Sequence, residues 1–267
     1  MTYEDINLKT EGAVAIAEIN RPKCLNAFRK QTFLELAGVL EQTASANSIR
    51  VLIITGTGRA FSSGKDLNEV DADHAAPDVG ASTRAELEQL QEITRRMLAH
   101  PCVLIAAVNG PAVGFGAELS LNCDIRLASQ SASFAFIEAR RGLFPTNAAH
   151  FLLPRLIGQG RAAEMLLSGR TVSAAETGEW GFVNRVVADE RLMDATLEIA
   201  HAIARNAPIT VRESLRLLRQ SYQLSLEDVL IREMDATMRC LSLGDVAEGA
   251  QAFFEKREPR FKGEEAS

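Results

Sequence analysis

The sequence is poor in the residues that form disulfides and metal sites. Only four cysteines and four histidines occur in 267 residues. No two cysteines form a Cys-x-x-Cys pair, and the histidines are scattered without the spacing of ligands on one helix face. This pattern argues against a disulfide-bonded secreted domain and against a zinc site. We therefore expect reduced thiols, a cytoplasmic location and no bound metal.

Long apolar runs and an excess of positive charge are also missing. No apolar run approaches the roughly 20 residues that a membrane-spanning helix needs, so we expect no membrane association. The chain begins Met-Thr-Tyr-Glu-Asp, which has neither a basic leader nor an apolar core, and we expect no secretion signal. The formal net charge of −6 argues against nucleic acid as a main partner.

Strand-like and helix-like segments alternate over the first 190 residues, and only helical patterns follow. Strand-like segments include 6–10, 13–19, 51–55 and 102–108, and the helix-like segments between them include 32–46 and 84–98. This alternation predicts an α/β fold with parallel strands. We expect a core over 1–190 and a helical region over 191–267. We also expect Asn26 to cap the helix over 32–46.

Two of the predicted strands run into glycine-bearing loops that lead to helices. Gly64-Lys65 follows the strand at 51–55, and Gly114-Phe115 follows the strand at 102–108. The glycine spacing is neither that of a phosphate loop nor that of a dinucleotide fingerprint. If the strands are neighbours, both loops lie at one sheet edge, where the N–H groups of Lys65 and Phe115 can form an oxyanion hole beside Glu118. Two tight turns with a surface glutamate are the alternative on these residues alone.

Six stretches of the sequence, taken together, are similar to a known family. They are 21–27, 60–67, 109–124, 134–145, 178–184 and 253–258. Their order and spacing from about residue 6 to 262 resemble the enoyl-CoA hydratase/isomerase (crotonase) superfamily. The resemblance implies a spiral of ββα turns with a C-terminal all-helical region that builds trimers, commonly paired into hexamers. It also implies acyl-CoA thioesters as substrates, with coenzyme A carried by the substrate and no separate cofactor.

The resemblance further implies roles for individual residues. Hydratase-type members carry two glutamates, which fall here on Glu118 and Glu138. Glu118 would activate the water that adds at Cβ, and Glu138 would exchange the proton at Cα. Two carboxylates held close have pKa values pushed apart, so that one is ionised and the other protonated.

Further residues correspond to the family's oxyanion, coenzyme A and pocket positions. The oxyanion donors fall on the backbone of Lys65 and of Phe115, a position where the family often has glycine. The positions that meet coenzyme A are Lys23, Ala60, Ser62, Asp66, Phe253 and Lys256, the last sometimes supplied by a neighbouring subunit. Gly114 and Thr146 fall at the water and acyl pocket. On the residues alone, Asp66 fits a helix cap, and each lysine fits a solvated surface position equally well.

One segment departs from the hydratase pattern and leaves alternatives open. After Pro145 the family has a small, glycine-rich run, whereas this chain has Thr-Asn-Ala-Ala-His. Thr146 falls where a glycine backbone helps to hold the water. Asn147 or His150 would either contact a functionalised acyl chain or have surface or capping roles.

The leading hypothesis is an enoyl-CoA hydratase that adds water syn across a 2-enoyl-CoA. One alternative is another crotonase reaction, either double-bond isomerisation, for which Glu138 alone would serve, or hydration and dehydration of a polar acyl-CoA such as a carnitinyl-type substrate. A remote alternative is a non-catalytic or RNA-binding relative, against which both glutamates and the acidic charge balance argue.

Overall fold

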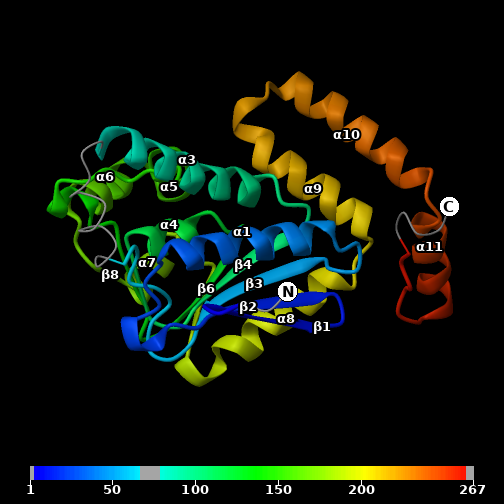
Figure 1. Ribbon diagram of the computed structural model, residues 1–267. Helices are drawn as coiled ribbons and strands as arrows, with labels where there is room; N and C mark the ends of the chain where they lie inside the picture. Colours follow the sequence, from blue (N-terminus) through cyan, green and yellow to red (C-terminus); the bar gives the residue numbers. More distant parts are fainter. Residues whose placement is uncertain (1–2, 67–78, 263–267) are drawn as a thin grey trace.

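The computed structural model describes residues 3–66 and 79–262 (Figure 1). Within them, the main sheet has the order β1-β2-β3-β4-β6-β9, and a small sheet has the order β5-β7-β8. The main-sheet strands are β1 (Ile6–Glu11), β2 (Val14–Ile19), β3 (Val51–Gly56), β4 (Val103–Val108), β6 (Ile125–Ser129) and β9 (Arg185–Val187). The others are β5 (Pro111–Val113), β7 (Ser133–Ala135) and β8 (Val172–Ser173). The predicted mixed α/β architecture is confirmed.

The strand directions follow from the residue patterns. β1 and β2 form an antiparallel hairpin, and the pairs from β2 to β9 are all parallel. Every residue of β3 and β4 is buried, and these strands are apolar and β-branched because helices cover both faces. β3 and β4 are direct neighbours, with Val51 opposite Val103 and Thr55 opposite Ala107. Their C-terminal ends therefore coincide.

Helices form a layer on each side of the main sheet. The helices before the last strand are η1 (Pro22–Cys24), α1 (Lys30–Ser45), α3 (Val79–Leu98), α4 (Phe115–Leu121), η2 (Glu138–Arg141), α5 (Ala149–Ile157), α6 (Gln159–Ser168) and α7 (Ala174–Glu179). Those after it are η3 (Asp189–Arg191), α8 (Leu192–Ala204), α9 (Pro208–Gln220), η4 (Ser221–Gln223), α10 (Leu226–Leu241) and α11 (Asp245–Glu255). Figure 1 shows α1, α3 and α4 on one side of the strands and α8 on the other.

The chain after residue 190 divides into two parts. α8 packs Leu192, Ala195 and Ala200 against the β2–β4 side chains and so completes the core. α9, α10 and α11 follow one another away from the sheet, and α11 lies at the end of the molecule farthest from α6 (Figure 1). Within residues 3–66 and 79–262, no helix has the length and apolar character needed to cross a membrane.

The prediction that Asn26 caps the first long helix is wrong. α1 begins at Lys30 with Arg29 as its N-cap residue, and Asn26 is fully buried with a φ of +56°. Its side chain accepts from the N–H of Arg21 and donates to the carbonyls of Thr57 and Ala60. Asparagine tolerates this left-handed conformation better than most residues. Asn26 therefore fastens two loops together at the sheet edge.

Candidate active site

Two loops meet at the C-terminal edge of β3 and β4. Ser62 pairs with Ala112 in a parallel bridge, and the N–H of Val113 donates to the Ser62 carbonyl at 2.9 Å. A Cβ atom added to Gly64 would lie 2.7 Å from the Val113 carbonyl and 3.4 Å from the Phe115 nitrogen. Contact this close, and a φ of +92°, restrict this position to glycine. The prediction that both loops lie at one edge is confirmed.

The backbone N–H groups of Lys65 and Phe115 have no acceptor among the described residues and so can donate to a ligand. Phe115 is the first residue of α4, so its N–H has no acceptor inside the helix. Among residues 3–66 and 79–262, neither N–H donates to another described group. The Phe115 ring packs edge-on against Phe28 and Phe33, with centroids 4.9 and 4.8 Å apart. The larger side chain is thus accommodated away from the backbone donor.

A largely apolar cleft of about 240 Å³ opens beside these donors. Phe33 and Phe115 form one wall, and Leu87 and Leu90 of α3 form another. Six predicted site residues line the cleft, namely Lys65, Gly114, Phe115, Glu118, Glu138 and Thr146. The structure therefore brings together the residues to which catalytic, oxyanion and pocket roles were assigned.

Glu118 lies in the first turn of α4 and is only 2% exposed. Its Oε1 accepts from the Asn147 N–H at 3.1 Å, and its Oε2 accepts from the Asn147 side-chain amide at 2.6 Å. Burial raises the pKa of Glu118, while the hydrogen bonds from Asn147 oppose that rise. The carboxylate thus receives donors that favour its ionised form.

Glu138 opens η2 and has a different environment. A Cβ on Gly114 would lie 3.2 Å from the Glu138 Oε1, and Gly114 has a φ of +53°. The Glu138 Oε2 is buried, and no described group forms a hydrogen bond with it. Burial, with a further contribution from the charge of Glu118, raises the pKa of Glu138 to about 7. Glu118 therefore accepts hydrogen bonds, and Glu138 has a pKa of about 7.

The predicted coenzyme A positions separate into two groups. Lys23 is exposed on η1, whereas Ala60 and Ser62 are buried in the loop after β3. Asp66 is buried too, and its Oδ2 lies 3.0 Å from the Arg21 Nη1. The residues that would follow Asp66 as a helix cap, 67–78, lie outside the described residues. Ala60, Ser62 and Asp66 thus belong to the segment after β3 that also carries Gly64 and Lys65 of the cleft, whereas Lys23 lies on η1.

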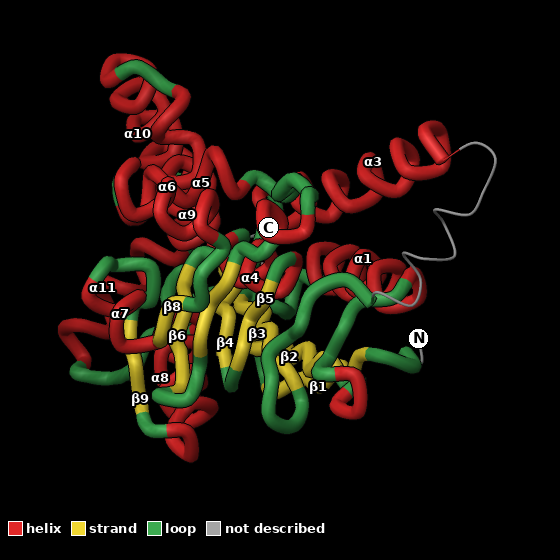
Figure 2. The backbone as a smooth tube through the Cα atoms, turned by 90° about the vertical axis from the view of Figure 1, so that its left-hand side faces the viewer, coloured by secondary structure: helices red, strands yellow, loops and turns green. Residues whose placement is uncertain are grey.

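Phe253 and Lys256 lie elsewhere. Phe253 is 80% exposed on α11, and Lys256 is the residue that ends that helix. Figures 1 and 2 both show α11 well separated from α4. Any contact of these two residues with coenzyme A would therefore be made at the cleft of another copy of the chain.

Three interactions at the cleft were not predicted from the sequence. The Lys65 Nζ lies 2.6 Å from the Glu86 Oε1, and this ion pair joins the loop that carries Gly64 and Lys65 to α3. Asn147 was left with open alternatives, and Thr94, which donates to it, was not considered. His150 stacks on the exposed ring of Phe144 at the rim, with centroids 4.5 Å apart. A local sequence pattern gives no signal for the contacts of Lys65 with Glu86 and of Thr94 with Asn147, which join separate segments of the chain.

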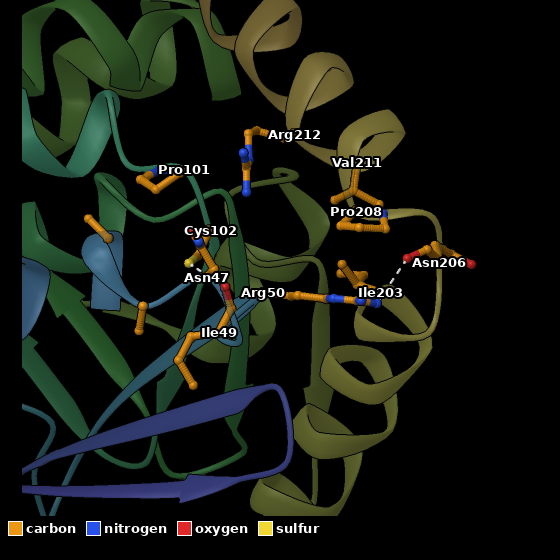
Figure 3. Close-up of a pocket in the computed structure, with 12 residues that line it drawn as sticks. Asn47, Ile49, Arg50, Pro101, Cys102, Ile203, Asn206, Pro208, Val211 and Arg212 are labelled. Carbon is orange, nitrogen blue, oxygen red and sulfur yellow. Dashed lines mark hydrogen bonds between the residues drawn. The ribbon is translucent and has the colours of Figure 1, made fainter. Parts of the chain in front are cut away.

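A second, smaller hollow lies at the opposite edge of the sheet (Figure 3). It measures about 30 Å³, which is far smaller than the cleft beside Glu118. Arg50 reaches across it and donates to the carbonyls of Ala204 and Asn206 at 2.6 and 3.3 Å. Burial raises the pKa of the Cys102 thiol to about 11, so the thiol stays protonated and unreactive at neutral pH. Residues of α8 and α9 line this hollow together with residues that precede β3 and β4, and none of the predicted site residues lies in it.

Comparison with known proteins agrees with this geometry. Residues 9–264 match the sequence profile of the enoyl-CoA hydratase/isomerase family. The chain is 36% identical over 255 residues to 1,2-epoxyphenylacetyl-CoA isomerase of Escherichia coli (strain K12), covering 95% of this chain and 96% of that protein. It is 37% identical over 267 residues to carnitinyl-CoA dehydratase of Proteus mirabilis (strain HI4320), covering 97% and 99%. A crystal structure of enoyl-CoA hydratase from Bacillus anthracis matches with a TM-score of 0.92 at 35% identity, covering 98% and 100%.

Proposed function

The chain belongs to the enoyl-CoA hydratase/isomerase (crotonase) superfamily and has its fold, and we propose that it is an enoyl-CoA hydratase. In this proposal the enzyme adds water reversibly and syn across the double bond of a 2-enoyl-CoA. Relatives of comparable identity include an isomerase, a dehydratase and hydratases, so family membership alone does not select the reaction. The observation that carries the proposal is the pair of carboxyl groups held in unlike environments in one cleft.

The mechanism assigns one task to each group. The N–H groups of Lys65 and Phe115 bind the thioester oxygen and stabilise the enolate, a contribution of about 3 kcal/mol per donor. Ionised Glu118 accepts a proton from water as the water oxygen bonds to Cβ. Protonated Glu138 then donates its proton to Cα, and the enolate collapses to the 3-hydroxyacyl-CoA. The two glutamates end with their protonation states exchanged and return to the starting state by passing a proton back through solvent.

The environment of each glutamate supports this assignment. Asn147 offers Glu118 donors, which suits a base that must be ionised. Glu138 has a pKa of about 7 and a buried oxygen without a described partner, which suits an acid that is partly protonated at neutral pH. Isomerisation needs only one base that carries a proton between two carbons. A second carboxylate in the same cleft therefore favours hydration.

The test follows the loss of the 2-enoyl thioester absorbance with crotonyl-CoA, with NMR identification of the product. We expect formation of 3-hydroxybutyryl-CoA by the wild type and not by Glu118→Gln. A 3-enoyl-CoA serves as the comparison substrate. Conversion of the 3-enoyl-CoA by both enzymes, without hydration of crotonyl-CoA, would show an isomerase instead. Turnover of a polar acyl-CoA such as carnitinyl-CoA alone would show the related dehydratase.

We also propose that the protein is a homo-oligomer. α10 presents an apolar stripe at helical spacing, formed by Leu226, Leu230, Met234, Met238 and Leu241, which are each about half to three-quarters exposed. Phe253 and Phe254 on α11 are 80% and 81% exposed. Apolar surface of this extent is rare on a monomer and marks an interaction site. Sedimentation velocity of the wild type should give a trimer or hexamer, and a monomer at micromolar concentration would contradict the proposal.

A further inference from the structure

We infer that Asn147 is a positioning residue for Glu118, whose carboxylate it holds in the orientation that accepts a proton from the attacking water. The inference deepens the proposed hydratase function and rests on it. Asn147 stands in the segment after Pro145, where the sequence departs from the family pattern. It is 1% exposed, and it lines the cleft together with Glu118.

Asn147 contacts both oxygens of the Glu118 carboxylate. Its backbone N–H donates to Oε1 at 3.1 Å, and its side-chain Nδ2 donates to Oε2 at 2.6 Å. The same Nδ2 lies 3.3 Å from the Thr146 hydroxyl, so both of its hydrogens have acceptors. A backbone and a side-chain donor from one residue fix the rotation of the carboxylate as well as its position. The acceptor sites that Asn147 leaves unused are available to water in the cleft.

The Thr94 hydroxyl supports the orientation of the Asn147 amide. The Thr94 hydroxyl lies on α3 and donates to the Asn147 Oδ1 at 3.1 Å. With its oxygen held by Thr94, the amide presents only N–H groups to Glu118. A flipped amide would place its oxygen against the carboxylate, where two acceptors face each other. Thr94 is 8% exposed and lies one helical turn beyond Leu90, which lines the acyl cleft.

Asn122 locks the backbone of Asn147 to α4. The Asn122 Nδ2 donates to the Glu118 carbonyl at 2.8 Å and to the Asn147 carbonyl at 3.0 Å. The next residue, Ala148, has a φ of +63°, a conformation that is uncommon for residues other than glycine. The chain therefore holds Asn147 in place with contacts from α3 and α4 and with an unfavourable backbone turn. Backbone strain of this kind, at Ala148, is typical of functional sites and fits a positioning role for the adjacent Asn147.

The contacts have a chemical consequence for Glu118. The titratable groups whose charge acts on it are Glu138 from η2 and His150 from α5. α3 contributes the neutral Thr94, and also Glu86, which is paired with Lys65 at the same cleft, and η2 contributes Arg141 to the cleft lining. Burial raises the pKa of Glu118, and the donors from Asn147 lower it. Removal of the side-chain donor should therefore raise that pKa. The base would then become protonated at a higher pH than in the wild type.

The test measures kcat, KM and the pH profile of kcat/KM with crotonyl-CoA. Asn147→Ala should lower kcat by roughly 10- to 100-fold, the effect of losing one hydrogen bond to a charged group, with little change in KM. It should also move the acid limb of the profile to higher pH by about one unit. Thr94→Val should act in the same direction more weakly, and Thr94→Ser should restore wild-type values. Thr196→Val, a buried threonine on α8 whose hydroxyl donates to Leu192, is the matched control and should change neither quantity.

A second readout does not depend on turnover. The carboxyl carbons of ¹³C-labelled glutamates are titrated by NMR in the wild type and in Asn147→Ala, and the signal of Glu118 is assigned by its loss in Glu118→Gln. We expect a higher Glu118 pKa in Asn147→Ala. An unchanged titration together with an unmoved acid limb would overturn the inference, even if wild-type hydration supports the proposed function. If the wild type hydrates no enoyl-CoA, the proposed function fails and the NMR titration still decides the role of Asn147.

Discussion

Replacement of Glu138 by glutamine is expected to lower kcat for hydration of crotonyl-CoA by about 10³-fold, a typical contribution of general acid catalysis. This loss corresponds to about 4 kcal/mol of transition-state stabilisation. Glutamine has nearly the same size as glutamate, so it should fit against Gly114 where the carboxyl group now lies. It has no proton of suitable acidity to give to Cα. The variant should therefore bind acyl-CoA, with the thioester oxygen at the two backbone N–H groups, without completing the reaction.

Two controls separate chemistry from folding in this experiment. Binding of the product 3-hydroxybutyryl-CoA to Glu138→Gln should remain close to the wild-type value, because the proposed oxyanion donors are backbone groups of Lys65 and Phe115. Glu179→Gln, on α7 and outside the cleft, should leave kcat unchanged. A Glu138→Gln variant that binds product normally and retains a tenth or more of the wild-type kcat would remove Glu138 from the mechanism.

The pH dependence of the wild type belongs to the same prediction. Glu138 has a pKa of about 7 and must be protonated to act as the acid. Its protonated fraction falls tenfold for each pH unit well above that pKa, so kcat/KM for hydration should decline on the alkaline side of about pH 7. Glu118 must be ionised, so kcat/KM should also decline at acid pH. The two limbs report on the pair, since the carboxylates influence each other.

The reverse reaction must show the same pH profile. Hydration takes up no net proton, so its equilibrium constant does not vary with pH. Because that constant is the ratio of the two kcat/KM values, hydration of crotonyl-CoA and dehydration of 3-hydroxybutyryl-CoA must share one pH profile. A shared proton explains this, because each direction needs one protonated and one ionised glutamate. An alkaline limb absent up to pH 9 in both directions would contradict the role of Glu138 as the acid.

The sequence was sufficient to predict the edge of the sheet at which the site lies. The runs at 51–55 and 102–108 are so uniformly apolar that both had to be buried strands, and parallel neighbours bring their following loops together. Gly64 and Gly114 then identified the residues whose N–H groups are exposed to the cleft. These features depend on local patterns and on the topology of parallel sheets, and both can be read from the chain in order.

The supporting contacts of the site could not be predicted in this way. Thr94 and Asn147 are 53 residues apart and meet only because α3 packs over the segment after η2. Asn26 has the composition of a helix cap, but the tertiary contacts with Thr57 and Ala60 override that local preference. A side-chain hydrogen bond between remote segments leaves no periodicity in the sequence. The hydrophobic pattern thus predicts the sheet edge at which the proposed site lies, whereas the assignment of Glu138 came from the family resemblance. The polar contacts that orient the two glutamates require the structure.

The C-terminal end of α4 depends on a single buried arginine. Arg126 is 4% exposed, and its Nε donates to the Phe182 carbonyl at 2.7 Å. Its Nη1 donates to the Cys123 carbonyl and, more weakly, to those of Ser120 and Leu121. Within the described residues, no carboxylate forms an ion pair with this guanidinium. It instead meets the negative end of the α4 dipole, a favourable place for a positive charge.

Arg126→Met is therefore expected to lower the free energy of unfolding by about 3 kcal/mol, because at least two buried carbonyls lose their donor. Arg126→Lys should lower it less, since lysine keeps the charge but cannot reach the Phe182 and Cys123 carbonyls together. Urea unfolding at one fixed protein concentration measures both changes, with Arg191→Met as a surface control. An unchanged midpoint for Arg126→Met would show that the carbonyls find other donors.

α4 spans only Phe115–Leu121, too short to persist alone, and it carries both the Phe115 N–H and Glu118. The hydrogen bonds of Arg126 therefore stabilise the helix on which both the proposed base and one proposed oxyanion donor lie.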